Sequence, residues 1–360
     1  MDGNAKLDQL LTAMTLEEKL TLLAGDSLWT VPGVPRLGIR PLKVSDGPAG
    51  VRGNRIVPAA AFPAPVLLGA TWDPGLVERI GQALAEEAET KGVQVVLAPT
   101  INLQRTALGG RNFECFSEDP WLTARLAVAY VRGLQSRGIG ACIKHFVAND
   151  QEFERHTISI EVDERPLREL YLFPFAVVIS EADPWCVMAA YNRLNGIYCS
   201  EHPWLLTTVL RDELGYSGVA MSDWFGTHST VEALEAGLDL EMPGPPQWRG
   251  AKLREAVERG AVSVEAIDRS VRRILTLYQR AGRLESGPDS TEERAIDRPE
   301  HRALIREVAA SGMVLLRNDG ILPLDVQAFR RIAVLGPHAI RPAVGGGGSA
   351  FVRSHPVVTP

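Results

Sequence analysis

The strongest constraint on this chain is the alternation of short apolar segments with longer amphipathic ones between residues 41 and 242. Short apolar segments predict strands buried on both faces, and the longer segments have the periodicity of helices. The expected strands are 41–44, 93–99, 141–147, 186–191, 219–221 and 237–242. The expected helices are 8–23, 74–91, 120–137, 166–181, 203–214, 231–238 and 251–281. This order predicts a parallel α/β sheet with right-handed crossovers, either closed as a barrel or open and doubly wound.

The absence of a Gly-x-Gly-x-x-Gly motif after the first expected strand disfavours an open sheet that binds a dinucleotide. Residues 1–281 are expected to form one domain. Residues 282–298 lose the apolar period and gain charge, Gly and Pro, as a linker would. A helix at 299–312, followed by the apolar residues 313–316, and a strand at 331–335 are expected to begin a second α/β domain, 299–360. We expect it to be incomplete, because so few elements cannot bury a core.

Composition disfavours several classes of function. The chain is 45% hydrophobic and 23% charged, as globular proteins are. A net charge of −6 without a basic cluster makes nucleic acid an unexpected partner. No apolar stretch is long enough for a bilayer, so no membrane partner is expected. The N-terminus lacks the pattern of a secretory signal, which predicts a cytoplasmic location. The composition does not indicate an oligomeric state.

The cysteines do not indicate a metal site. Four are present, Cys115, Cys142, Cys186 and Cys199, without a Cys-x-x-Cys pair or a zinc-like spacing with histidine. Buried free thiols are expected at Cys142 and Cys186, which lie in apolar segments. We therefore expect neither a metal nor another cofactor.

Polar side chains follow the expected strands where each strand ends. Asp223 and Trp224 follow 219–221, and the C-terminal end of a barrel strand is where such folds keep their chemistry. An N-cap for the helix at 231–238 is an equally open interpretation of Asp223. Lys144 and His145 lie inside an apolar segment, where two ionisable groups need a polar cavity to face.

Four more residues complete this set: Asp46, Arg111, Arg155 and Tyr191. Some have a purely structural alternative, since Asp46 would close an exposed turn, Arg111 would pair with Glu114, and His145 would be a satisfied core histidine. Their coincidence at one end of one sheet favours a functional site. Cations, a histidine, a carboxylate and a tryptophan suit a sugar, because hydroxyls need donors and acceptors while the ring face needs an aromatic platform.

Several motifs make the chain resemble glycoside hydrolase family 3, and within it the β-glucosidase branch. They occur in the family's order within residues 40–245, namely 46–52, 110–114, 117–120, 144–149 continuing to 155, 188 with 191–192, and 221–224. The resemblance implies a (β/α)8-like TIM-type barrel, regular or irregular in its first strands, followed by the beginning of an α/β sandwich domain. It implies hydrolysis of terminal β-D-glucosyl residues of a small glycoside by a retaining double displacement.

The resemblance also implies roles for the residues. Asp223 would be the nucleophile, and Trp224 would wall the entrance. The residues implied to bind sugar hydroxyls are Asp46, Arg111, Lys144, His145 and Arg155, and those implied to line the −1 subsite are Met188 and Tyr191. The family's glucosaminidase branch places a catalytic histidine in the loop that here is Val147-Ala148-Asn149-Asp150, which favours the glucosidase branch.

The acid/base residue is not identified. In the β-glucosidase branch it is a glutamate of the second domain, so we expect it beyond Pro360. Nearby glutamates are Glu114, Glu118, Glu152 and Glu154, and none is selected. The alternatives are a β-xylosidase of the same family, a non-catalytic sugar-binding form, and an unrelated barrel such as an aldolase with Lys144 as the Schiff-base lysine.

Overall fold

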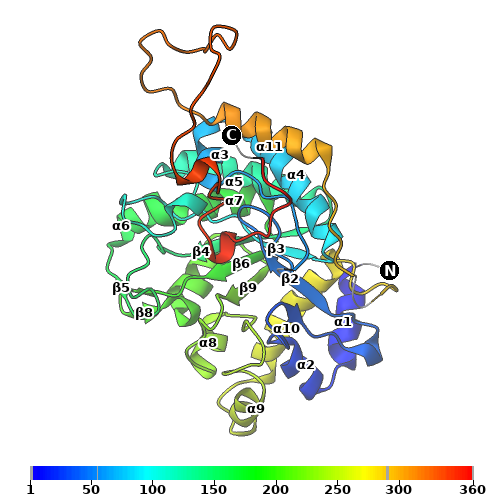
Figure 1. Cartoon of the computed structure of the whole chain (residues 1–360). Helices are drawn as coiled ribbons and strands as arrows, with labels where there is room; N and C mark the ends of the chain where they lie inside the picture. The colour runs from blue at the N-terminus through cyan, green and yellow to red at the C-terminus, as the bar shows by residue number, and fades with distance from the viewer. Residues whose placement is uncertain (1–2, 55, 289–291, 359–360) are drawn as a thin grey trace.

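A curled, mostly parallel sheet forms the centre of the molecule in the computed structural model, which describes residues 3–54, 56–288 and 292–358 (Figure 1). The order of its strands is β1-β2-β3-β4-β6-β9, and β1 alone runs antiparallel to its neighbour. The strands are β1 Thr30–Val31, β2 Leu42–Asp46, β3 Val95–Leu97, β4 Gly140–Phe146, β6 Cys186–Ala189 and β9 Val219–Ser222. A small second sheet consists of β5 Ser159–Ile160, β7 Arg193–Leu194 and β8 Ile197–Tyr198.

Helices join successive strands, as the sequence predicts. Before and between the strands lie α1 Gly3–Ala13, α2 Leu16–Leu22, α3 Pro65–Thr71, α4 Pro74–Thr90, α5 Pro120–Gln135, α6 Glu164–Pro166 and α7 Phe173–Ala182. After β9 lie α8 Val231–Ala236, α9 Ala251–Glu258, α10 Val264–Arg280 and α11 Pro299–Ser311. Two segments predicted as helices contain π-helical turns, η3 Leu167–Leu172 and η5 Trp204–Glu213.

Local signals set the ends of several helices. Asp73 caps α4 through the Leu76 amide and is followed by proline, which has no amide hydrogen to leave unpaired. Thr15 and Glu18 form a capping box, which divides the predicted helix 8–23 into α1 and α2. The predicted helix 251–281 is similarly divided, because Ser263 caps a new helix, α10.

Alternate strand residues face two separate cores. Val96, Ile143 and Ala220 pack with α4, α5 and α7, which cover the outer face of the sheet in Figure 1. Met188 and Met221 point the other way and pack with apolar residues of α2 and α10. Burial on both faces explains why the strands are apolar without alternation. All four cysteines are buried and free, as predicted for two of them.

The prediction of a strand at 237–242 is wrong, because these residues form only isolated bridges. Leu240 makes one isolated bridge to Met221, and Glu241 makes one to Ala24. The reason is local, since the Asp239 carboxylate accepts the Ala220 amide at 2.9 Å in place of a backbone carbonyl. The parallel α/β sheet is therefore confirmed, but the described residues form a curled half-barrel rather than a clearly closed eight-stranded barrel.

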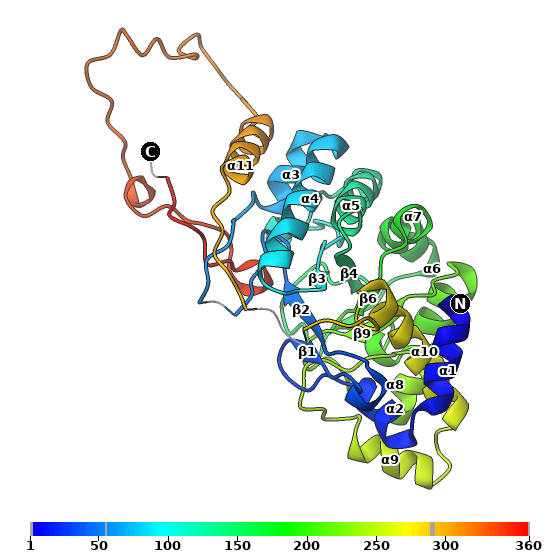
Figure 2. The same ribbon diagram turned by 90° about the vertical axis from the view of Figure 1, so that its right-hand side faces the viewer.

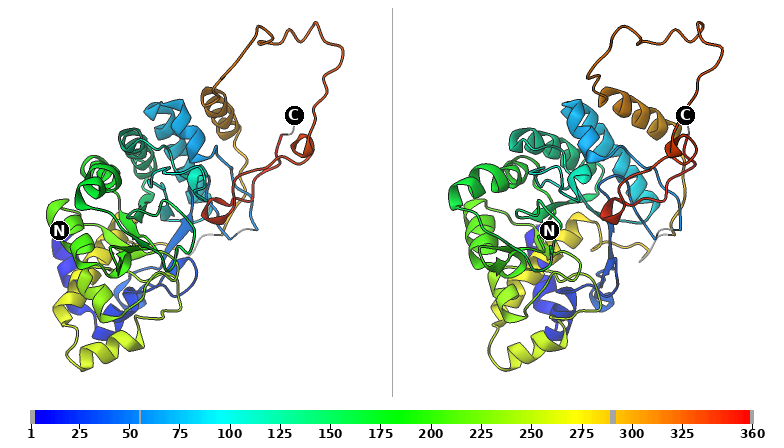
Figure 3. Two further views of the ribbon diagram at one scale, coloured as in Figure 1. Left: turned by 90° about the vertical axis from the view of Figure 1, so that its left-hand side faces the viewer. Right: turned by 60° about the vertical axis from the view of Figure 1, so that its left-hand side comes forward.

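The part after α10 begins as predicted and then departs from the prediction. Helix α11 matches 299–312 and packs on α3 and α4. The predicted strand 331–335 does not form, and after α11 the chain leaves the body as a long loop (Figures 2 and 3). A strand needs a neighbour for its amides, and within the described ranges none lies beside this loop, where Leu316 is 92% exposed.

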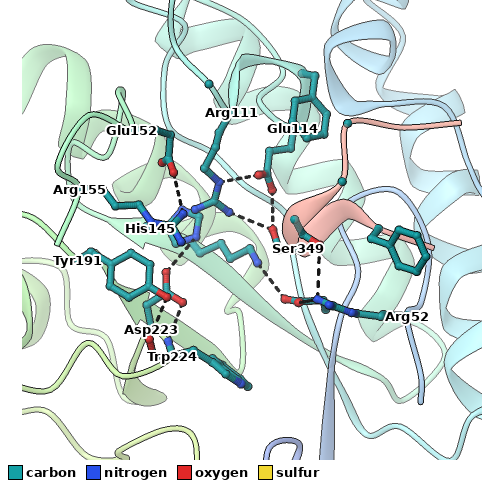
Figure 4. A pocket seen from close by; sticks show the side chains of 18 of the residues that line it. Arg52, Arg111, Glu114, His145, Glu152, Arg155, Tyr191, Asp223, Trp224 and Ser349 are labelled. Atoms are coloured by element: carbon teal, nitrogen blue, oxygen red, sulfur yellow. Dashed lines mark hydrogen bonds and ion pairs between the residues drawn. The ribbon is translucent and has the colours of Figure 1, made fainter. Parts of the chain in front are cut away.

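No described helix combines the length and the apolar character needed to cross a bilayer. The chain returns to the body near its end, where Ser354 forms a bridge with Ala59. Residues 346–349 consequently reach the ends of β2 and β4, beside the polar residues that follow these strands (Figure 4).

Candidate active site

A cavity of about 890 Å³ opens at the C-terminal ends of β2, β4 and β9 (Figure 4). Eight predicted site residues line it: Asp46, Arg111, Lys144, His145, Arg155, Tyr191, Asp223 and Trp224. Residues outside the prediction also line it: Leu28, Trp29, Arg52, Gly110, Phe113, Glu114, Glu152, residues 346–349 and Phe351. Parallel strands place their carboxyl ends on one edge of the sheet, which is why residues distant in sequence meet here.

Asp223 lies directly after β9 and is only 8% exposed. The Trp224 amide donates to Asp223 Oδ1 at 2.7 Å, and His145 Nε2 lies 3.5 Å from Oδ2. Burial raises the pKa of Asp223, while the nearby cations Arg111 and Lys144 oppose that rise. The helix-cap alternative is wrong, because α8 begins at Val231, eight positions later in the sequence.

Asp46 ends β2 and lies between two cations. Arg52 Nη1 donates to its Oδ2 at 2.7 Å, and Lys144 Nζ lies 3.6 Å from Oδ1. The expected exposed turn is wrong, because only 8% of Asp46 is accessible to solvent. Burial raises the pKa of this carboxyl, and Lys144 acts against the rise. Asp46 is therefore a buried acceptor whose position two cations hold.

Arg111, in the segment between β3 and α5, contacts the glycine-rich segment 345–350. Its Nε donates to Glu114 Oε1 at 2.5 Å, and its Nη2 donates to Ser349 Oγ at 3.0 Å. Ser349 Oγ also donates to Glu114 Oε2 at 2.9 Å. The structural alternative for Arg111, a pair with Glu114, is thus present, and the same guanidinium also lines the cavity.

Arg155 and Tyr191 lie on the side of the cavity away from Arg52 in Figure 4. Arg155 Nη1 donates to Glu152 Oε2 at 2.7 Å, and its guanidinium carbon lies 4.8 Å from the centre of the Tyr191 ring. The Tyr191 hydroxyl donates to the Trp224 carbonyl at 3.0 Å. Burial and the charge of Asp223 raise the pKa of Tyr191, so the phenol stays protonated and available as a donor.

Two tryptophans form the apolar wall of the cavity. The rings of Trp29 and Trp224 lie 5.3 Å apart at 40° to each other. Trp224 Nε1 donates to the Leu28 carbonyl at 3.1 Å, which holds the indole in place. The prediction included Trp224 alone, because Trp29 lies far from any expected strand end in a segment rich in glycine and proline.

Met188 is the one predicted site residue that the structure does not bring to the cavity. It lies on β6 in register with Lys144 of β4 and is 1% exposed. Its side chain packs in the inner core with Met221 and Met242, and its implied place at the −1 subsite stays a prediction. Among the missed residues, Arg52 had a signal, since it belongs to the motif 46–52, but residues 346–349 lie in a glycine-rich segment that was expected to belong to the second domain.

The comparisons with known proteins agree with this geometry. The family profile described as "Glycosyl hydrolase family 3 N terminal domain" matches residues 33–277, which is more than half of the chain. The chain belongs to glycoside hydrolase family 3. A β-glucosidase of Rhizobium radiobacter is 55% identical over 358 residues, covering 98% of this chain and 44% of that protein. β-Glucosidase B of Emericella nidulans is 48% identical over 363 residues, covering 99% and 43%.

Solved structures of family 3 enzymes have the same fold. A β-glucosidase from Kluyveromyces marxianus in complex with glucose has a TM-score of 0.94 and 40% identity, and covers 98% of this chain and 43% of that chain. β-Glucosidase 3B from Thermotoga neapolitana in complex with glucose has a TM-score of 0.91 and 39% identity, and covers 97% and 52%. The chain thus spans less than half the length of the two β-glucosidases matched by sequence.

Proposed function

We propose that this chain supplies the nucleophile and most of the −1 subsite of a retaining β-glucosidase. The observation that carries the proposal is the buried Asp223 carboxylate in a cavity that holds cations and a tryptophan wall. The relatives named β-glucosidase and the similar structures with glucose bound support it. For the fold, we propose that the bridges at Leu240 and Glu241 are where the sheet closes toward a barrel.

Asp223 Oδ2 is the proposed nucleophile. It would attack the anomeric carbon, forming a C–O bond to the enzyme while the bond to the leaving oxygen breaks. The reaction needs an ionised carboxylate, and burial alone would favour the neutral acid. Arg111 and Lys144 counter that effect and also stabilise the negative charge, which explains why two cations belong beside an apolar wall.

Recognition of the sugar would follow from the remaining lining residues. Asp46 offers carboxylate acceptors, while Lys144 and Arg155 offer donors, and such charged partners form the stronger hydrogen bonds to hydroxyls. Trp224 would contact the apolar side of the substrate at the entrance. The residues on opposite walls would orient the ring so that its anomeric carbon faces Asp223.

We propose that the acid/base residue comes from outside residues 1–360. A retaining enzyme needs a second carboxyl group about 5–5.5 Å from the nucleophile, protonated before the first step. Glu114 and Glu152 line the cavity, but each is already in an ion pair, with Arg111 and Arg155 respectively, and Arg111 holds the pKa of Glu114 below its usual value. The greater length of the relatives supports a donor from another part of the protein.

The test is covalent trapping of the complete enzyme with a 2-deoxy-2-fluoro-β-D-glucoside that carries an activated leaving group. Fluorine destabilises the oxocarbenium-like transition state, so the glycosyl-enzyme should accumulate, and peptide mapping should find the label on Asp223. Asp223→Asn is the matched control and should remain unlabelled. A label on another carboxylate would refute the assignment. Faster trapping by the corresponding xyloside would favour the β-xylosidase alternative.

A further inference from the structure

Asn102 contacts His145, a residue that lines the cavity, at three atoms. Its Nδ2 donates to the His145 carbonyl at 2.9 Å, and its Oδ1 accepts the His145 backbone amide at 2.9 Å. Asn102 Oδ1 also lies 3.1 Å from His145 Nδ1. Both residues are buried, with 3% and 1% of their surfaces exposed. This residue does not line the cavity, and its role depends on which amide atom faces the imidazole.

The backbone of His145 determines the orientation of the Asn102 amide. The His145 backbone N–H needs an acceptor, and the His145 carbonyl needs a donor. A flipped Asn102 would place its NH2 group against the backbone N–H and its oxygen against the carbonyl, so neither hydrogen bond could form. The atom beside His145 Nδ1 is therefore Oδ1, which only accepts hydrogen bonds. Nδ1 must carry the proton for the contact at 3.1 Å to be a hydrogen bond.

The other ring nitrogen, Nε2, is then left with its lone pair. Burial lowers the pKa of His145, and the positive charges of Arg111, Lys144 and Arg155 lower it further, so the ring is neutral and Nε2 has no proton. Nε2 lies 3.5 Å from Asp223 Oδ2, which in the ionised nucleophile is also an acceptor. His145 Nε2 and Asp223 Oδ2 are thus neighbouring acceptors without a donor between them, and a hydroxyl group beside them could donate its hydrogen to Nε2.

We propose that Asn102 is a positioning residue that holds His145 in the Nδ1–H tautomer, so that Nε2 accepts a hydrogen bond from a hydroxyl group of the bound sugar beside Asp223. Asn102 acts through His145 and touches no substrate itself. The assignment of the tautomer is independent of the proposed function. The sugar hydroxyl as donor rests on the proposed function, so the two statements need separate measurements.

Nitrogen-15 NMR of histidine-labelled protein without ligand tests the tautomer, because protonated and bare ring nitrogens resonate in separate ranges. The chain has seven histidines, and His145→Gln identifies the signals of interest. We expect a protonated Nδ1 and a bare Nε2 at neutral pH. A protonated Nε2 in the wild-type protein, whether the ring is neutral or charged, would overturn the proposal.

Two variants of Asn102 and one control separate positioning from general support of the fold. Asn102→Ala should give a mixture of tautomers. Asn102→Asp keeps the acceptor and adds a negative charge, so it should retain the Nδ1 proton and raise the pKa of the ring. Asn192→Ala removes an equally buried asparagine that donates to Val147, and it should leave the His145 signals unchanged. Unchanged signals in both Asn102 variants would refute the proposal.

The hydroxyl donor is tested by calorimetric binding of glucose and its monofluorinated analogues to the complete enzyme. Fluorine replaces a hydroxyl in size but cannot donate, so the analogue fluorinated opposite Nε2 should bind about tenfold more weakly. In Asn102→Asp, where the ring can carry a second proton, this penalty should shrink. An equal penalty in both proteins would refute the donor assignment. Glucose that fails to bind would refute the proposed function and leave the NMR result to decide the tautomer.

Discussion

Replacing Glu114 by glutamine is expected to lower the free energy of unfolding by about 3 kcal/mol. The side chains of Glu114 and Arg111 are 2% and 14% exposed, and their atoms Oε1 and Nε lie 2.5 Å apart. Removing one charge of such a pair leaves the other buried without compensation, which typically costs about 3–5 kcal/mol. Glutamine can still accept from Ser349, so we expect the lower end of this range.

Urea unfolding of the variants measures this effect, and a double-mutant cycle isolates it. The double variant, Arg111→Met with Glu114→Gln, should lose less unfolding free energy than the two single variants lose together. We expect this coupling to be about 2 kcal/mol. Glu307→Gln is the matched control, because its partner Arg79 and Glu307 itself are nearly half exposed. An exposed pair should contribute less than about 1 kcal/mol.

The acid side of the pH profile gives a second check on Glu114. Burial favours the neutral acid, but Arg111 outweighs that effect and holds the pKa of Glu114 below its usual value of 4.5. A lowered folded pKa adds stability above the unfolded value, and this contribution is lost as pH falls through the folded value. The difference between the wild type and Glu114→Gln should therefore shrink below pH 4.5. If Glu114→Gln lowered the free energy of unfolding at neutral pH by less than about 1 kcal/mol, as the exposed control Glu307→Gln should, the buried pair would not have the stabilising effect argued here.

Two further predictions concern His301 and Asp46. Burial opposes the charged ring of His301, yet Glu87 and Glu86 together raise its pKa above the usual value, so its stabilisation is present below the unfolded pKa and is lost as pH rises through the folded one. His301→Gln should lower Tm by about 2–4 °C in mildly acidic buffer and by less in alkaline buffer, and a larger alkaline effect would contradict this. Asp46→Asn in the complete enzyme should lower kcat/KM for an aryl glucoside by about 10²-fold and also lower Tm, because it weakens the partner of two buried cations. Unchanged kcat/KM would remove Asp46 from the binding site.

Elements with local signals could be predicted from the sequence, and elements that depend on distant partners could not. Helix α4 begins at a proline behind a capping aspartate, and β4 is an apolar segment that starts at a glycine and is interrupted only by Lys144 and His145. The predicted strands 237–242 and 331–335 also contain several apolar residues. Residues 237–242 form only isolated bridges, because the Asp239 carboxylate accepts the hydrogen bond of the Ala220 backbone amide. Residues 331–335 have no partner strand within the described residues.

The candidate site divides in the same way. The sequence by itself determined the positions of Asp46, Lys144 and Asp223, because a polar residue at the end of a buried strand is visible in a local pattern and parallel strands bring such ends together. Only the tertiary structure decided that Trp29 packs against Trp224 and that Ser349 bridges Arg111 and Glu114. These contacts join segments far apart in the chain, and packing alone selects them.

The same distinction explains Met188 and Asn102. Met188 belongs to a family motif, and although it is in register with Lys144 of β4, its side chain packs with the inner core. Asn102 follows β3 without any sequence feature that separates it from a loop asparagine. Its contact with His145 exists because β3 and β4 are neighbours in the sheet, so the hydrogen bond that sets the histidine tautomer is a property of strand order and register rather than of local sequence.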